Sequence, residues 1–107
     1  MPFYMMMDYT ISKQLEQDFE RYMMSFYAKF KRFSIEDFGK FATTLLNYNI
    51  QNHQIGIKMK QQYAYFLTTL FNRGIGNRIT EEHLQEIANV IAADSSVDFA
   101  IIQELFG

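Results

Sequence analysis

The sequence predicts an all-α fold, a single small bundle of about five helices with short connections. Three observations support this prediction. Apolar residues recur every three or four positions in successive segments, which is the spacing of a helix face. The length of 107 residues suits one domain. The composition, 49% hydrophobic and 21% charged, is that of a globular protein. We therefore expect one helical domain over 1–107, with 1–9 loosely ordered.

The clearest helical pattern covers 11–33. Its apolar residues repeat at intervals of three or four, with most polar residues between them. These apolar residues are Ile11, Leu15, Phe19, Tyr22, Phe26, Phe30 and Phe33. Met23 and Tyr27 widen the stripe. We expect a helix over 11–33 with an aromatic and methionine flank beside its buried face.

The next two helices are expected over 34–48 and 53–73. Ser34 offers its hydroxyl to the free amides of a helix start, and Asp37 three residues later forms a weak capping box. The start of the later helix is less regular, because apolar residues alternate with Gly and Lys over 55–59. A short strand is therefore the alternative within 53–59, but no partner strand is visible elsewhere.

Two further helices are expected in the last third of the chain. Thr80 is a typical N-cap, and the two glutamates after it suit the positive end of a helix dipole. This helix is expected to end near Ala93. Ser95 and Asp98 then resemble the boxed start of a final helix.

Two of the expected helix ends have similar sequences. Phe, Thr, Thr, Leu, Asn, Ile and Asn occur at the same spacing in 41–52 and in 66–77. Asn49 and Gly74 occupy equivalent positions, and Asn and Gly most readily adopt the left-handed conformation that ends a helix. We therefore expect a Schellman stop at each position. Two copies are too few for a solenoid, which needs at least about three.

Charge is unevenly distributed along the chain, although the net charge is only −2. The segment 38–80 contains five Lys and Arg and no Asp or Glu, whereas 81–107 contains six Asp and Glu and no Lys or Arg. Nucleic-acid binding is the alternative function: contact with phosphates and stacking on bases are expected from a set of basic residues interleaved with two tyrosines and an asparagine, namely Lys58, Lys60, Arg73, Arg78, Tyr63, Tyr65 and Asn77. The pI of about 5.6 argues against it. We prefer charge complementarity within the fold or across a dimer.

The sequence lacks a local catalytic or metal-binding motif. His53 and His83 have no carboxylate or thiol at ligand spacing, so no metal and no cofactor is expected. Arg78 and His83 form an Arg-x-x-x-x-His spacing that resembles the signature of the HEPN ribonucleases, which are all-helical dimeric enzymes. The resemblance implies RNA cleavage by this pair as a third function. The expected cap at Thr80 places Arg78 outside the helix, which departs from the family pattern.

The surplus of aromatic and methionine residues predicts a non-enzymatic protein–protein interaction module that self-associates as a homodimer. The expected partner-binding residues are Phe3, Tyr4, Tyr22, Met23 and Tyr27. A small adaptor, an inhibitor or immunity protein, and a mobile-element accessory protein are the roles considered, with self or an unknown protein as partner. The absence of cysteine, of an export signal at 1–7 and of a long apolar run predicts a cytoplasmic protein without a membrane anchor.

Overall fold

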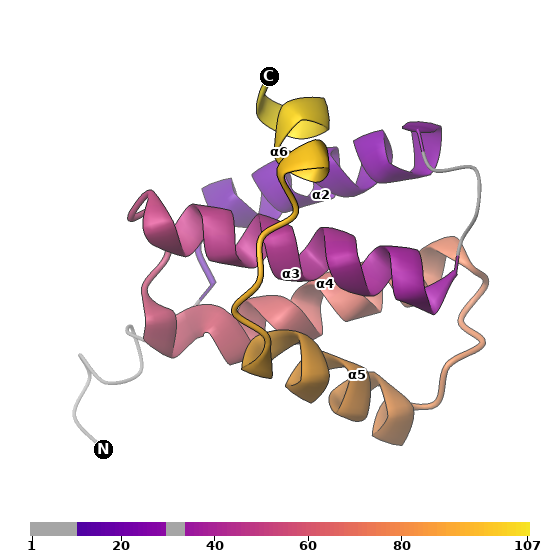
Figure 1. Ribbon diagram of the computed structural model, residues 1–107. Helices are drawn as coiled ribbons and strands as arrows, with labels where there is room; N and C mark the ends of the chain where they lie inside the picture. Colours follow the sequence, from indigo (N-terminus) through magenta and orange to yellow (C-terminus); the bar gives the residue numbers. More distant parts are fainter. Residues whose placement is uncertain (1–10, 30–33) are drawn as a thin grey trace, which may run out of the picture.

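The structure is a computed structural model that describes residues 11–29 and 34–107. Helices and no strands occur in these ranges, which confirms the all-α prediction. The elements are α2 (Lys13–Lys29), α3 (Ile35–Gln51), the short 3-10 helix η1 (Ile57–Met59), α4 (Lys60–Gly74), α5 (Glu81–Ala93) and α6 (Phe99–Phe106). Figure 1 shows α3 running between α2 and α5, with α6 at the α2 side of the bundle.

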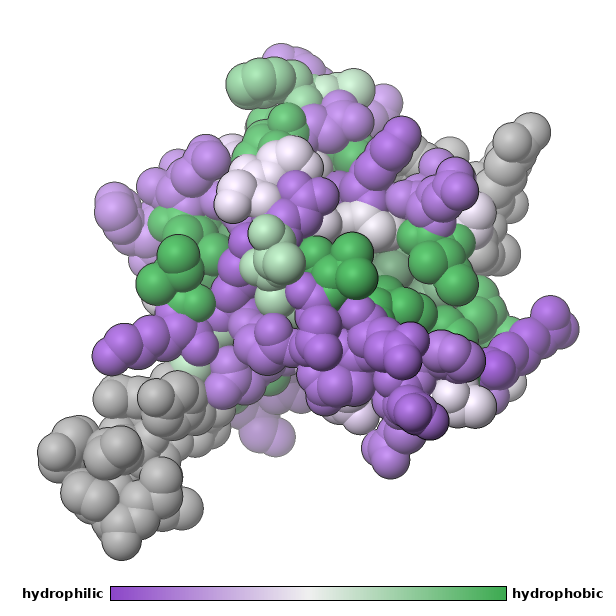
Figure 2. Space-filling model, turned by 60° about the horizontal axis from the view of Figure 1, so that its bottom comes forward, coloured by the Kyte–Doolittle hydropathy of each residue, from purple (hydrophilic) through white to green (hydrophobic). Residues whose placement is uncertain are grey.

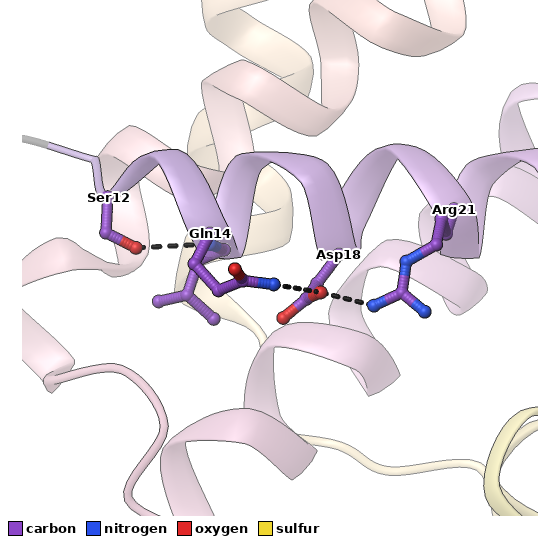
Figure 3. A network of polar contacts seen from close by, with 5 residues as sticks. Ser12, Gln14, Asp18 and Arg21 are labelled. Carbon is purple, nitrogen blue, oxygen red and sulfur yellow. Dashed lines mark hydrogen bonds and ion pairs between the residues drawn. The ribbon is translucent and has the colours of Figure 1, made fainter.

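The helix expected over 11–33 is α2, and positions 30–33 lie outside the described residues. Ser12 starts the helix, because its hydroxyl accepts the amide N–H of Leu15 at 3.1 Å. Figure 3 shows this bond and the polar contacts that follow along the helix. Gln14 donates to the Asp18 carboxylate at 3.1 Å, and Arg21 forms an ion pair with the same carboxylate. These contacts occupy the polar side of α2 and leave its apolar side for the core.

Aromatic rings from successive helices build the centre of the core. Phe38 of α3 stacks on Phe71 of α4 with ring centroids 4.4 Å apart. Phe26 of α2 lies 4.9 Å from Phe41 of α3. All four rings have 0% exposure. Since each buried ring removes a large apolar area from water, these contacts account for much of the aromatic surplus seen in the sequence.

The connection between α3 and α4 differs from the expectation. Helix α3 continues to Gln51 instead of ending near Tyr48, and α4 begins at Lys60 and not at residue 53. The intervening residues form a turn and then η1, so neither the helix start nor the strand expected within 53–59 is present. The physical reason is burial: the turn directs Ile55, which is only 6% exposed, into the core.

The prediction that Asn49 and Gly74 adopt the left-handed conformation was wrong. Both residues lie within their helices, and the positive φ angles of the described residues occur at His53 (61°), Gly76 (89°) and Asn77 (57°). Asn49 is buried, and its side-chain amide donates to the carbonyl of Leu45 at 2.8 Å, a bond made one turn back along a continuing helix. The sequence similarity therefore identified the type of stop and misplaced it along the chain.

Both helix ends nevertheless have Schellman geometry. At the end of α3, the amide of Gln54 donates to the carbonyl of Asn49 at 2.8 Å. At the end of α4, the amide of Asn77 donates to the carbonyl of Asn72 at the same distance. In each case the bond spans the left-handed residue and satisfies a carbonyl that the helix leaves free.

Two of the three expected N-caps are confirmed. Ser34 accepts the amide of Asp37 at 3.1 Å, and Thr80 accepts the amide of His83 at 3.4 Å. The cap expected at Ser95 is wrong, because α6 begins after Asp98, whose carboxylate accepts the amide of Ala100 at 2.9 Å. An aspartate at this position also suits the positive end of the helix dipole.

Side chains of α3 and α4 form hydrogen bonds with the segment that connects α5 to α6. The Asn47 amide donates to the carbonyls of Asp94 at 3.0 Å and Ser96 at 2.8 Å. Lys60 donates to the same Asp94 carbonyl at 2.8 Å. These bonds satisfy backbone groups that have no helical partner, and they direct α6 back across α3 (Figure 1).

Candidate functional site

The fold separates the residues predicted to bind a partner. Phe3 and Tyr4 lie outside the described residues. Tyr22 is half-buried, and its ring meets Phe106 of α6 edge-on with centroids 5.3 Å apart. Met23 is 2% exposed and belongs to the core. Tyr27 is half-buried at the boundary between α2 and α4. The continuous exposed flank expected from the sequence therefore does not form on this helix.

Part of that flank lines a groove between α2 and α4, which we call the α2–α4 groove. Its volume is about 410 Å³. Its lining residues are Glu20, Met23, Met24 and Tyr27 of α2 and Leu70, Arg73 and Gly74 of α4. Residues spaced by three and four positions lie on one helix face, so each helix contributes a single face to the groove.

Tyr27 lines the groove and links the two helices. Its hydroxyl donates to the carbonyl of Leu70 at 3.0 Å. Burial raises the pKa of Tyr27, and the guanidinium of Arg73 lowers it to a smaller extent. Because the usual pKa of tyrosine is already about 10, the hydroxyl is protonated at neutral pH and remains a donor.

Gly74 makes room for this tyrosine. A Cβ atom added at Gly74 would lie 2.5 Å from Cζ of Tyr27 and closer still to its hydroxyl oxygen. Gly74 is thus required for the close approach of the ring, and not for a left-handed backbone.

The α2–α4 groove combines an apolar floor with two opposite charges. Met23 and Leu70 are buried beneath it, whereas Met24 is 67% exposed. Glu20 and Arg73 are both exposed and line the same groove. A surface with an apolar centre and polar edges is typical of protein interfaces, and methionine adapts readily to the shape of a partner.

The four basic residues of the nucleic-acid alternative are spread along the fold, and one of them is buried. Lys58 lies in η1, before α4, whereas Arg73 lies in the last turn of α4, about 20 Å away along the helix axis. Lys60 is only 8% exposed, and its ammonium group donates to the Asp94 carbonyl at 2.8 Å. Burial lowers the pKa of Lys60, and the nearby Asp94 carboxylate opposes this shift. Arg78 is exposed in the connection before α5.

The tyrosines of that alternative are also engaged within the fold. Tyr63 is 2% exposed, so its ring is not available to stack on a base. Tyr65 donates to the carboxylate of Glu81 at 3.3 Å, which joins the basic segment to the acidic end of the chain. Gln61 adds a neutral contact between these segments, since it donates to Asn89 at 2.6 Å.

The Arg78 and His83 pair has the arrangement that the Thr80 cap predicts. Arg78 precedes α5, and His83 lies in its first turn with Nδ1 3.1 Å from the hydroxyl of Thr80. Among the residues that the structure describes, no three His, Asp or Glu side chains are grouped so as to hold a metal ion. No helix in the described ranges is both long and apolar enough to cross a bilayer.

Sequence reasoning missed the half of the α2–α4 groove that comes from α4. The sequence predicts Arg73 as a candidate phosphate contact and Gly74 as a helix stop, and neither prediction places them in a groove. The half of the groove that comes from α2 was detectable in the sequence, because Glu20, Met23 and Tyr27 share one helical face. Which helix lies beside that face depends on tertiary packing. A comparison of the chain with protein-family models, with curated proteins and with solved structures finds no significant match.

Proposed function

We propose that the chain is a non-enzymatic protein-interaction module that self-associates as a twofold dimer through the α2–α4 groove. One observation carries the proposal: this groove holds an exposed apolar residue, Met24, together with one acid and one base, Glu20 and Arg73. A surface of this kind is complementary to a second copy of itself.

The symmetry of a twofold contact gives the two charges their role. In such an interface the same surface comes from both copies, so a residue of one copy contacts a different residue of the other, and the contact occurs twice. Glu20 of one copy then faces Arg73 of the other at each edge, while the two Met24 side chains meet near the centre. The charges select the orientation, and burial of the two exposed Met24 side chains contributes the apolar part of the affinity.

The alternatives have less support from the geometry. A nucleic-acid interface needs exposed basic residues and free aromatic rings, whereas Lys60 and Tyr63 are both buried. For the HEPN-like alternative, Arg78 precedes α5 instead of sharing a helix with His83. As biological roles we propose a small adaptor, an inhibitor or immunity protein, or a mobile-element accessory protein. We propose the cytoplasm as its location, since the chain contains no cysteine.

Sedimentation equilibrium at concentrations up to about 100 μM tests self-association. We expect a dimer for the parent chain and a monomer for Met24→Glu, because the substitution places a charge in the apolar centre. The matched control is Phe99→Glu, which changes an apolar residue of α6 that is 79% exposed and should leave the dimer intact. A parent chain that is monomeric throughout, or a dimer that persists in Met24→Glu, would refute the proposal.

A further inference from the structure

A second groove, between α3 and α5, has a different character, and we call it the α3–α5 groove. Its volume is about 390 Å³. Its lining residues are Ile35, Glu36 and Gly39 of α3 and Glu86, Ile87, Val90 and Ile91 of α5. Val90 is 71% exposed and Ile35 is 51% exposed. Figure 2 shows the face that carries α5, where hydrophobic surface gathers between bands of polar side chains.

Gly39 is the residue in this groove that the fold itself does not explain. It lies inside α3 with an ordinary helical backbone, where glycine is less stable than alanine. A Cβ atom added at Gly39 would meet nothing within 4 Å. Neither a neighbouring side chain of the described chain nor a left-handed turn therefore requires a glycine here. Its effect is to leave the floor of the groove open.

The charged residues that line the groove are of one sign. Both charged residues that line it, Glu36 and Glu86, are acidic. Asp37 follows in the first turn of α3 and Glu82 lies one turn before Glu86 on α5, which has no Lys or Arg. Lys40 is next to Gly39 in the sequence but is not among the lining residues.

We propose that the α3–α5 groove docks an amphipathic helix of another protein, whose apolar stripe is flanked by Lys and Arg residues. An apolar groove between two helices is the usual receptor for such a helix, and Gly39 gives one of its bulky side chains room to enter. The flanking cations would lie against Glu36 and Glu86. A second copy of this chain is a poor occupant, because a twofold contact here would bring the acidic edges together.

Fluorescence anisotropy with synthetic peptides tests this proposal. The probe is a fluorescein-labelled peptide of about four helical turns, with leucines along one face and lysines on either side of them. The matched peptide carries glutamate in place of every lysine. We expect saturable binding of the lysine peptide that weakens with salt, and at least about tenfold weaker binding of the glutamate peptide. The double substitution Glu36→Lys and Glu86→Lys should invert this preference.

Substitutions at Gly39 locate the binding surface. Gly39→Leu fills open space and should weaken binding of the lysine peptide by at least about tenfold while the variant remains folded. Gly39→Ala should weaken it less and melt at or above the parent temperature. Phe99→Lys, at an exposed apolar residue of α6, should leave the affinity unchanged.

Three results would overturn the proposal. They are the absence of saturable binding, equal affinity for the two peptides, and full affinity in a folded Gly39→Leu variant. A parent dimer that Val90→Glu dissociates would assign the groove to a second copy and would also overturn it. Because Met24→Glu leaves this groove intact, it should bind the lysine peptide normally, so failure of self-association and failure of docking are distinguishable.

Discussion

Gly74→Ala is the substitution whose outcome depends most on the packing of α2 against α4. Alanine is favoured over glycine in a helix by about 0.5–1 kcal/mol, so the backbone of α4 alone predicts stabilisation. The added Cβ, however, would lie 2.5 Å from Cζ of Tyr27. The ring must move away, and its bond to the Leu70 carbonyl is lost.

The magnitude follows from these opposing effects. Overpacking of this kind typically costs about 1–3 kcal/mol, which exceeds the gain in helix propensity. We therefore expect Gly74→Ala to destabilise the parent chain by about 1 kcal/mol. In a Tyr27→Ala background the obstacle is gone, and the same substitution should stabilise by about 0.5–1 kcal/mol. The coupling between the two positions is then about 2 kcal/mol.

Urea denaturation of the four chains of this cycle, followed by far-UV circular dichroism, measures the coupling. Gly39→Ala is the matched control, because its Cβ meets nothing within 4 Å. It should stabilise both the parent and the Tyr27→Ala chain by a similar amount. If Gly74→Ala changed the free energy of unfolding equally in both backgrounds, the contact of Gly74 with the tyrosine ring would be refuted.

Three further predictions concern stability. Gly76→Ala should destabilise by about 1 kcal/mol in urea denaturation because φ is 89°, and Gly76→Asn should lose less; equal stability of the parent and Gly76→Ala would contradict the Schellman stop. Asn47→Ala should lower the free energy of unfolding by about 1–3 kcal/mol, since two carbonyls lose their donor, whereas no loss would show that those bonds are unimportant. Because burial raises the pKa of Tyr27, its neutral form stabilises the fold below pH about 10 and this contribution is lost as pH rises through the raised pKa. The Tyr27→Phe variant should therefore lose less stability than the parent between about pH 9 and 11. Identical pH profiles would show that ionisation of Tyr27 does not destabilise the fold.

The helices were predictable because their apolar residues repeat with the period of a helix. The starts at Ser34 and Thr80 were predictable as well, since these hydroxyls have a defined role at a helix N-terminus. The residues at which the helices end were less predictable. His53 adopts the left-handed conformation while Asn49, the better residue for it, stays helical, because Asn49 is buried.

The candidate site was only half predictable for a similar reason. The face of α2 that carries Met23 and Tyr27 is readable from spacing alone. The sequence does not indicate that α4 lies beside this face, that Gly74 admits the tyrosine ring, or that α6 covers Tyr22. These contacts join residues that are far apart in the chain and depend on how the helices pack.

Charge reversal at the α2–α4 groove tests self-association through this surface most directly. Glu20→Arg and Arg73→Glu should each weaken the dimer by at least about tenfold, because each places like charges opposite one another at both edges. An equimolar mixture of the two variants restores opposite charges at both edges. Sedimentation equilibrium of this mixture should therefore show a heterodimer, while each variant alone is monomeric. A mixture that stays monomeric, or variants that each dimerise as the parent does, would contradict the account.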